Sequence, residues 1–149
     1  MSKASNLQEF LRSKAATAPE AEIDWAAEKA KWLQNIGRLY DLIAKWLGPL
    51  AEDGTVRYSK KPITLEEEGI GSYQVDILAL SIGRQTVEVR PKGREFEGTE
   101  GIVEVRGRRA VRTLIIKHGQ WLVVEKTMLL KTFPFNEDSF RDLLQDVMA

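Results

Sequence analysis

The chain contains no cysteine and a single histidine among its 149 residues. The absence of cysteine excludes disulfides, zinc–thiolate sites and thiol nucleophiles, and one histidine excludes a two-histidine metal site within one chain. His118 lies in "KHGQW", a sequence typical of a hairpin turn, so we interpret it as a turn residue and not as a catalytic one. No cofactor and no metal site are predicted.

Long apolar runs are also missing. No stretch of about 18 apolar residues occurs, so no transmembrane helix and no membrane association are expected. The N-terminal "MSKASNLQEFLRSKAATAPEAE" is too polar for a secretory signal. Together with the lack of cysteine, this predicts a cytoplasmic protein.

The chain carries no net charge, because 22 Lys and Arg balance 22 Asp and Glu. The basic residues are nevertheless concentrated between residues 84 and 134, where eleven face six acids. Such a patch can bind phosphate, but nucleic acid is not the favoured partner, because no aromatic residues are interleaved with the basic ones. We favour charged hairpin tips that keep sheet edges from pairing. The candidate basic patch comprises Arg90, Lys92, Arg94, Arg106, Arg108 and Arg109.

Helical periodicity dominates the first third of the chain. We predict a short helix over residues 5–14 and a long one that begins at the "TAPE" capping box at Thr17 and ends at Gly48-Pro49. Within the long helix, Trp25, Trp32 and Trp46 are spaced by multiples of seven and lie beside an apolar stripe.

The tryptophan row has two interpretations. The favoured one is that it widens the apolar face by which the helix packs on a sheet. The alternative is a pocket for a small apolar ligand between Trp25, Trp32 and the sheet. The candidate ligand or interface residues are therefore Trp25, Trp32, Trp46 and Trp121.

From Thr55 onward the period changes to two, and β-branched residues predominate, which predicts an antiparallel meander over residues 55–132. Two-residue turns are expected at Gly83-Arg84, Gly107-Arg108 and His118-Gly119. Pro62 is expected to divide "VRYSKK" from "ITLEE" into two strands. A final helix over 137–148 should begin after Asn136 as N-cap.

The hairpin around His118-Gly119 is apolar on both sides. A two-residue turn pairs Ile116 with Trp121 on one face and Ile115 with Leu122 on the other. The long helix can cover one face. The C-terminal helix or a second subunit must cover the other.

The stretch "VDILALSIGRQTVEVRPKG" resembles the PD-(D/E)xK nuclease motif. The resemblance implies that Asp76 and Glu88 hold Mg²⁺ and that Arg90 stands at the position of the family's lysine. A guanidinium stays protonated, however, and is a poor proton acceptor. The Gly83-Arg84 turn also pairs Ala79 with Glu88, so that Asp76 and Glu88 point to opposite faces.

These patterns predict one α+β domain over residues 1–149: a helical region at 5–48, a curved meander of five to seven strands, and a C-terminal helix. This resembles cystatin-like or NTF2-like architectures. The favoured function is a non-catalytic protein-binding, adaptor or accessory module that self-associates as a homo-oligomer or binds a protein partner. The alternatives are the metal-dependent nuclease and the small-ligand carrier.

Overall fold

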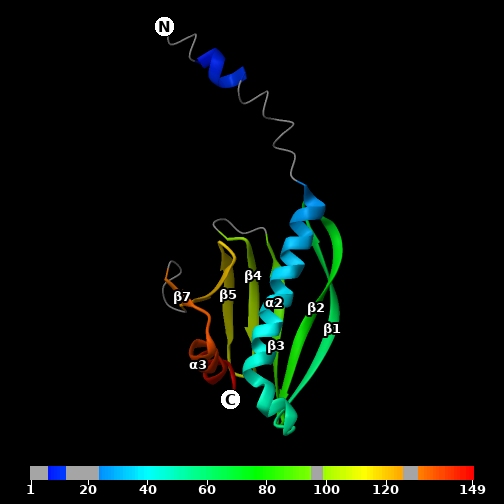
Figure 1. The fold of residues 1–149 in the computed structure, drawn as a ribbon, viewed down its shortest axis with the longest axis vertical. Helices are drawn as coiled ribbons and strands as arrows, with labels where there is room; N and C mark the ends of the chain where they lie inside the picture. The colour runs from blue at the N-terminus through cyan, green and yellow to red at the C-terminus, as the bar shows by residue number, and fades with distance from the viewer. Residues whose placement is uncertain (1–6, 13–23, 95–98, 126–130) are drawn as a thin grey trace.

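A computed structural model describes residues 7–12, 24–94, 99–125 and 131–149. In these ranges the chain forms a long helix, α2 (Trp25–Glu52), then strands β1 to β7, and finally the helix α3 (Glu137–Val147). This is the predicted α+β architecture (Figure 1). Residues 7–12 are helical, within the range predicted for the short first helix. The predicted helix start at Thr17 lies outside the described residues.

Aspartates cap both ends of α2. Asp24 is the N-cap, and its side chain accepts a hydrogen bond from the backbone N–H of Ala27. The predicted end at Gly48-Pro49 is wrong, because the helix continues to Glu52 with Pro49 inside it. Proline removes the hydrogen bond to the carbonyl four residues earlier, and its ring crowds that carbonyl. Three residues from the helix end that loss is local, and the N–H of Asp53 still bonds to the Pro49 carbonyl at 3.2 Å.

The sheet is a meander in which every strand pairs with the next, in the order β1 to β7. Among the described residues it has seven strands, at the upper end of the predicted number. The last strand, β7, was not predicted. The strands are β1 (Val56–Glu67), β2 (Gly71–Ile82), β3 (Gln85–Gly93), β4 (Gly101–Arg106), β5 (Val111–Lys117), β6 (Gln120–Val124) and β7 (Thr132–Pro134).

Two features of the strands differ from prediction. The first is that Pro62 does not divide β1, which runs continuously through it. β1 is an edge strand, where a residue without an N–H group is tolerated. The second is the connection between β4 and β5: Arg106 pairs with Val111, so the connection spans residues 107–110 and Gly107-Arg108 is not a two-residue turn.

The other two turns have the predicted register. Ile82 pairs with Gln85 across Gly83-Arg84, and Lys117 pairs with Gln120 across His118-Gly119. His118 has a positive φ of 50°, as a turn of this kind requires. The side chains of β5 and β6 therefore alternate between faces as the sequence predicts.

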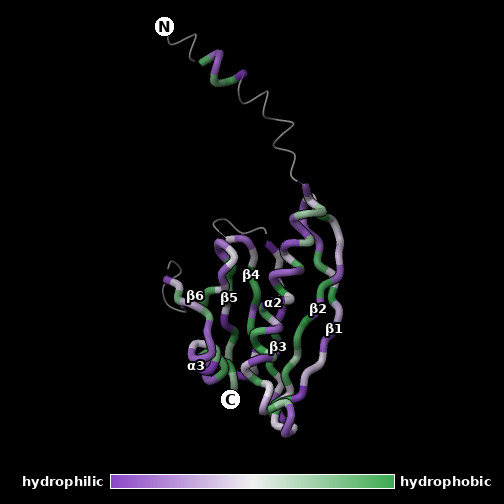
Figure 2. The backbone as a smooth tube through the Cα atoms, in the orientation of Figure 1, coloured by the Kyte–Doolittle hydropathy of each residue, from purple (hydrophilic) through white to green (hydrophobic). Residues whose placement is uncertain are grey.

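One face of the sheet, which we call the helix face, carries the main core. Apolar residues, coloured green, concentrate in the strands behind α2 (Figure 2). The buried strand residues of the helix face include Leu78, Leu80, Val87, Val89, Val103, Val105, Leu114, Ile116, Trp121 and Val123. They pack against the side of α2 that carries Trp32, Ile36, Leu39, Tyr40, Ile43 and Leu47.

The C-terminal helix α3 packs on this same face. Phe140, on α3, contacts Trp46 of α2 with ring centroids 5.7 Å apart. Asp146 forms an ion pair of 3.2 Å with Arg112, which pairs in register with the core residue Val105. Asn136 caps α3 as predicted, and Ser139 completes a reciprocal capping box. Thus α2 and α3 share one side of the sheet, and α3 does not cover the other.

Candidate functional site

The two acidic residues of the nuclease-like motif are not paired with each other: Asp76 pairs with Pro62, and Glu88 pairs with Ala79, as predicted. Glu88 alternates with the core residues Val87 and Val89, so it points away from α2. Asp76 lines a small cleft beside Tyr40 of α2. Among the described residues, no group of three or more His, Asp or Glu side chains is arranged to hold a metal ion. This arrangement does not support metal binding by Asp76 and Glu88.

Tyr40 occupies the place where β2 and β3 separate. Its hydroxyl bonds to the carbonyl of Asp76 on β2 and lies 3.3 Å from the carbonyl of Val89 on β3. The last paired residues of these strands are Leu78 and Val89. Burial raises the pKa of Tyr40, and the charge of Asp76 adds to the increase, while a backbone hydrogen bond from Leu78 opposes it. Tyr40 therefore serves as a neutral structural bridge between two diverging strands.

Trp25 and Trp32 each pack closely against a glycine of the sheet region. Trp32 is 1% exposed, and its ring lies so close to Gly101 that an added Cβ there would be 2.2 Å away. Trp25 packs on Gly69, and the guanidinium of Arg94 lies 4.9 Å from the centre of a Trp25 ring. Trp32 also lines a small cleft of about 220 Å³, whose other lining residues include the charged side chains Lys31 and Glu100.

A buried polar network surrounds Trp32, and the sequence analysis missed it. The indole N–H of Trp32 donates to the hydroxyl of Tyr73 at 2.9 Å, and that hydroxyl donates to the carboxylate of Glu67. The other carboxylate oxygen accepts from the backbone N–H of Arg94 at 2.8 Å. Burial, the hydrogen bond to Glu67 and the Glu67 charge raise the pKa of Tyr73. Because these hydrogen bonds join α2 to β2, β1 and the end of β3, we interpret the network as structural.

The predicted basic patch is divided among three places. Arg94 forms an ion pair with Glu28 on α2. Lys92 and Arg106 both approach Glu104 on the outside of the sheet, at 3.8 Å and 3.0 Å. Arg90 lies on β3 and pairs in register with Glu104, and its Nε is buried with no hydrogen-bond partner among the described residues. Arg108 and Arg109 are exposed in the connection between β4 and β5. The geometry does not form one continuous cationic surface.

The side of the sheet opposite α2, the outer face, carries an apolar row. Ile102 pairs with Ile115, Ile115 with Leu122, and Leu122 with Pro134, so four apolar residues cross β4 to β7 in register. This set is called the apolar row below. At a strand spacing of about 4.8 Å it extends about 14 Å. Ile77, Ala79 and Ile115 on this face are buried yet do not belong to the main core cluster.

No described helix or strand packs over the apolar row, since both α2 and α3 lie on the helix face. Charged side chains border the row on both sides. Glu104 on β4 is close to Lys92 and Arg106, and Lys117 lies toward the opposite end of β5. An apolar centre with an ion-paired rim is the usual composition of a protein–protein interface.

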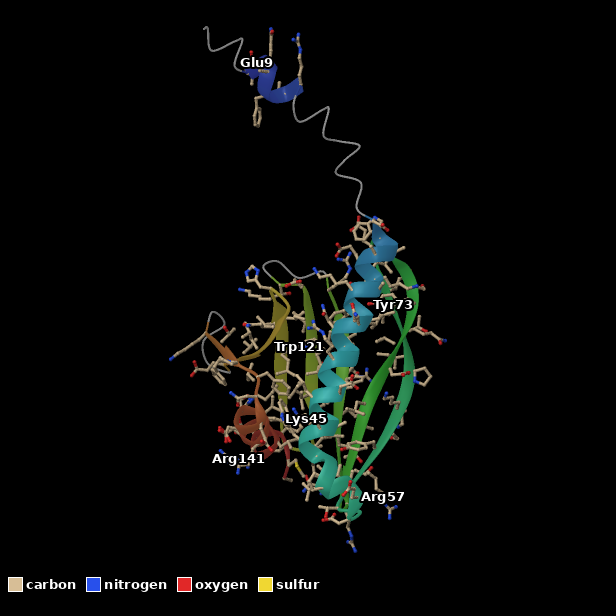
Figure 3. All side chains as sticks on the ribbon, in the orientation of Figure 1. Glu9, Lys45, Arg57, Tyr73, Trp121 and Arg141 are labelled. Carbon is tan, nitrogen blue, oxygen red and sulfur yellow. The ribbon has the colours of Figure 1, made fainter. Side chains whose placement is uncertain are left out.

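Two larger, mostly apolar grooves lie beside α2 on the helix face. One, of about 710 Å³, lies between Trp46 and Leu50 of α2 and Phe140, Leu144 and Met148 near α3. The other, which we call the α2–β6 groove, has a volume of about 630 Å³. Figure 3 labels two of its lining residues, Lys45 on α2 and Trp121 on β6. The lining of the α2–β6 groove includes Arg38, Asp41, Leu42, Lys45, Trp121 and Phe135.

Comparison with known proteins adds no family assignment: no protein-family model, curated protein or solved structure matches the chain significantly. Of the helices in the described residues, none has the length and apolarity needed to cross a membrane.

Proposed function

We propose that the chain is a non-catalytic, protein-binding module of the cytoplasm that self-associates as a dimer through the outer face of its sheet. The observation that carries the proposal is the apolar row, which lies in register over four strands and has no covering element among the described residues. The cytoplasmic location rests on the lack of cysteine in the sequence.

A twofold axis through the outer face brings the apolar row of one copy onto that of the other. Sheets that pack face to face lie about 10 Å apart and fill the space with alternate side chains from each strand. Ile102, Ile115 and Leu122 are the alternate residues here. The ion pairs around Glu104 then lie at the rim, where charged groups keep contact with water. Such an interface is self-complementary, as a twofold dimer requires.

Dilution tests this proposal. A dimer becomes more stable as its concentration rises, because association stabilises the folded state by mass action. We therefore expect the thermal unfolding midpoint of the wild type to increase with protein concentration. Leu122→Lys places a charge at the centre of the interface and should abolish this dependence.

Leu42→Lys is the matched control, because Leu42 is a partly exposed leucine on α2, on the helix side of the molecule. It should leave the concentration dependence unchanged. An unfolding midpoint of the wild type that does not move with concentration contradicts the proposal, as does equal sensitivity to the two substitutions.

The nuclease alternative has less support, because no group of three or more His, Asp or Glu side chains among the described residues could hold a metal ion. The ligand-carrier alternative has less support, because Trp32 is in close contact with Gly101 and the cleft that it lines is small, at about 220 Å³.

A further inference from the structure

We propose that residues 7–12 dock in the α2–β6 groove of their own chain. This inference concerns the helix face and is independent of the dimer proposed for the outer face. In the structure the helical segment stands apart from the sheet, with Glu9 marking its position (Figure 3). Both the segment and the groove present apolar side chains to solvent.

The segment has the pattern of a helix that binds in a groove. Leu7, Phe10 and Leu11 are 57%, 57% and 54% exposed and occupy positions i, i+3 and i+4, so they share one side of the helix. Amphipathic helices bind apolar grooves through anchors at this spacing. Six helical residues extend about 9 Å, a length over which two or three apolar side chains can enter one groove.

The groove offers a complementary surface. Leu42 of α2 is 36% exposed, and the floor is formed by Trp121 and Phe135, which are 7% and 9% exposed. Its volume of about 630 Å³ is within the usual range for binding clefts of about 300–1,000 Å³. Burial of leucine and phenylalanine side chains in such a groove is favourable by the hydrophobic effect.

Charges at the rim match those of the segment. Arg38, Asp41 and Lys45 border the groove, and the segment carries Glu9 and Arg12 beside its apolar positions. Glu9 can approach Lys45 while Arg12 approaches Asp41. Neither Asp41 nor Lys45 is part of an ion pair found among the described residues.

The connecting chain is long enough to reach. Leu42 is 17 residues beyond Trp25, which is about 26 Å along a helix at about 1.5 Å per residue. From Arg12 to Asp24 the chain has 12 residues, which span up to about 40 Å when extended. Docking within the same chain is therefore geometrically allowed.

Engineered cysteines test the docking directly, because the natural chain has none. The full-length double variant Leu11→Cys with Leu42→Cys should form an intramolecular disulfide under mild oxidation. The control pairs Leu11→Cys with Tyr58→Cys. Tyr58 is similarly exposed, at 38%, and its hydroxyl lies 3.5 Å from the carbonyl of Ala44, so it stands at nearly the same height along α2 but on β1.

Without docking, tethering alone gives both cysteine pairs an effective concentration on the order of millimolar, so collision crosslinks them at similar rates. Docking predicts that the Leu42→Cys pair crosslinks at least about tenfold faster than the Tyr58→Cys pair, and that adding Leu7→Ser and Phe10→Ser removes the difference. Equal rates for the two pairs overturn the proposal. A disulfide between two chains also overturns it, because the segment then occupies the groove of a neighbouring copy. Neither result depends on whether the outer face dimerises.

Discussion

The indole N–H of Trp32 donates a hydrogen bond to the hydroxyl of Tyr73, 2.9 Å away, and so joins the long helix to β2. Glu67, at the end of β1, accepts from the same hydroxyl and from the backbone N–H of Arg94 after β3. The network therefore fixes three strand ends against α2 at the place where β2 and β3 no longer pair.

Tyr73→Phe tests the importance of this network. The substitution leaves the indole N–H without its acceptor and removes a donor from the buried Glu67 carboxylate. We expect the free energy of unfolding to fall by about 1–3 kcal/mol in urea denaturation. The control Tyr58→Phe affects a tyrosine that is 38% exposed and should change it by less than about 0.5 kcal/mol. Equal losses in the two variants contradict the account.

Gly101→Ala tests the packing of Trp32. The new methyl group would lie 2.2 Å from the ring, so the ring or β4 must move, and a loss of about 1–3 kcal/mol is expected. Gly37→Ala is the matched control, because a Cβ at that position in α2 meets no atom within 4 Å. In a helix interior it should stabilise the protein by about 0.5–1 kcal/mol. The two changes in stability are measured by thermal unfolding. A Gly101→Ala variant as stable as the wild type would refute the close contact.

Tyr40 should contribute to the loss of folding stability at alkaline pH. Its burial raises its pKa, so the folded state holds the phenolic proton more tightly than the unfolded state does. The resulting stability is complete below the unfolded value of about 10 and is lost as the pH rises above it toward the folded pKa. Each such group contributes a slope of up to about 1.4 kcal/mol per pH unit.

Unfolding in urea between about pH 9 and 11 should therefore show a shallower decline for Tyr40→Phe than for the wild type. Because Tyr40→Phe also removes the hydroxyl that bridges Asp76 and Val89, a constant loss of about 1 kcal/mol at neutral pH is expected in addition. If the free energy of unfolding falls equally steeply with pH in both proteins, burial of Tyr40 does not raise its pKa as described.

Glu100 should contribute to stability in the opposite pH range. Burial tends to raise the pKa of Glu100, but hydrogen bonds from the Gly119 backbone and Lys31 outweigh it, and the net shift is downward. Its contribution is present above the unfolded pKa of about 4.3 and is lost as the pH falls through the folded value. Glu100→Gln should flatten the stability profile in acid, and Glu9→Gln, in the separate helical segment, should not.

The sequence was most informative where local chemistry decides structure. Positive φ at Gly83 and at His118-Gly119 determines two hairpins, and their two-residue length then fixes which side chains share a face. The helix end was predicted wrongly, because Pro49 is only three residues from Glu52 and tertiary packing of the preceding turns outweighs one lost hydrogen bond.

The contacts that lie between distant segments were beyond prediction. The network joins Trp32, Tyr73 and Glu67 over separations of up to 41 residues, and Gly101 meets Trp32 from a strand much later in the chain. No local pattern encodes those approaches. The alternation of β5 and β6, by contrast, predicted a second apolar face, and the location of α3 on the helix face leaves that face without a covering element among the described residues.

The molar mass of the wild type in solution, measured by light scattering over a range of concentrations, tests the central claim most directly. The account predicts a mass twice the chain's 16.9 kDa at high concentration, and a return to 16.9 kDa in Leu122→Lys but not in Leu42→Lys. A mass of 16.9 kDa for the wild type at every concentration would contradict it.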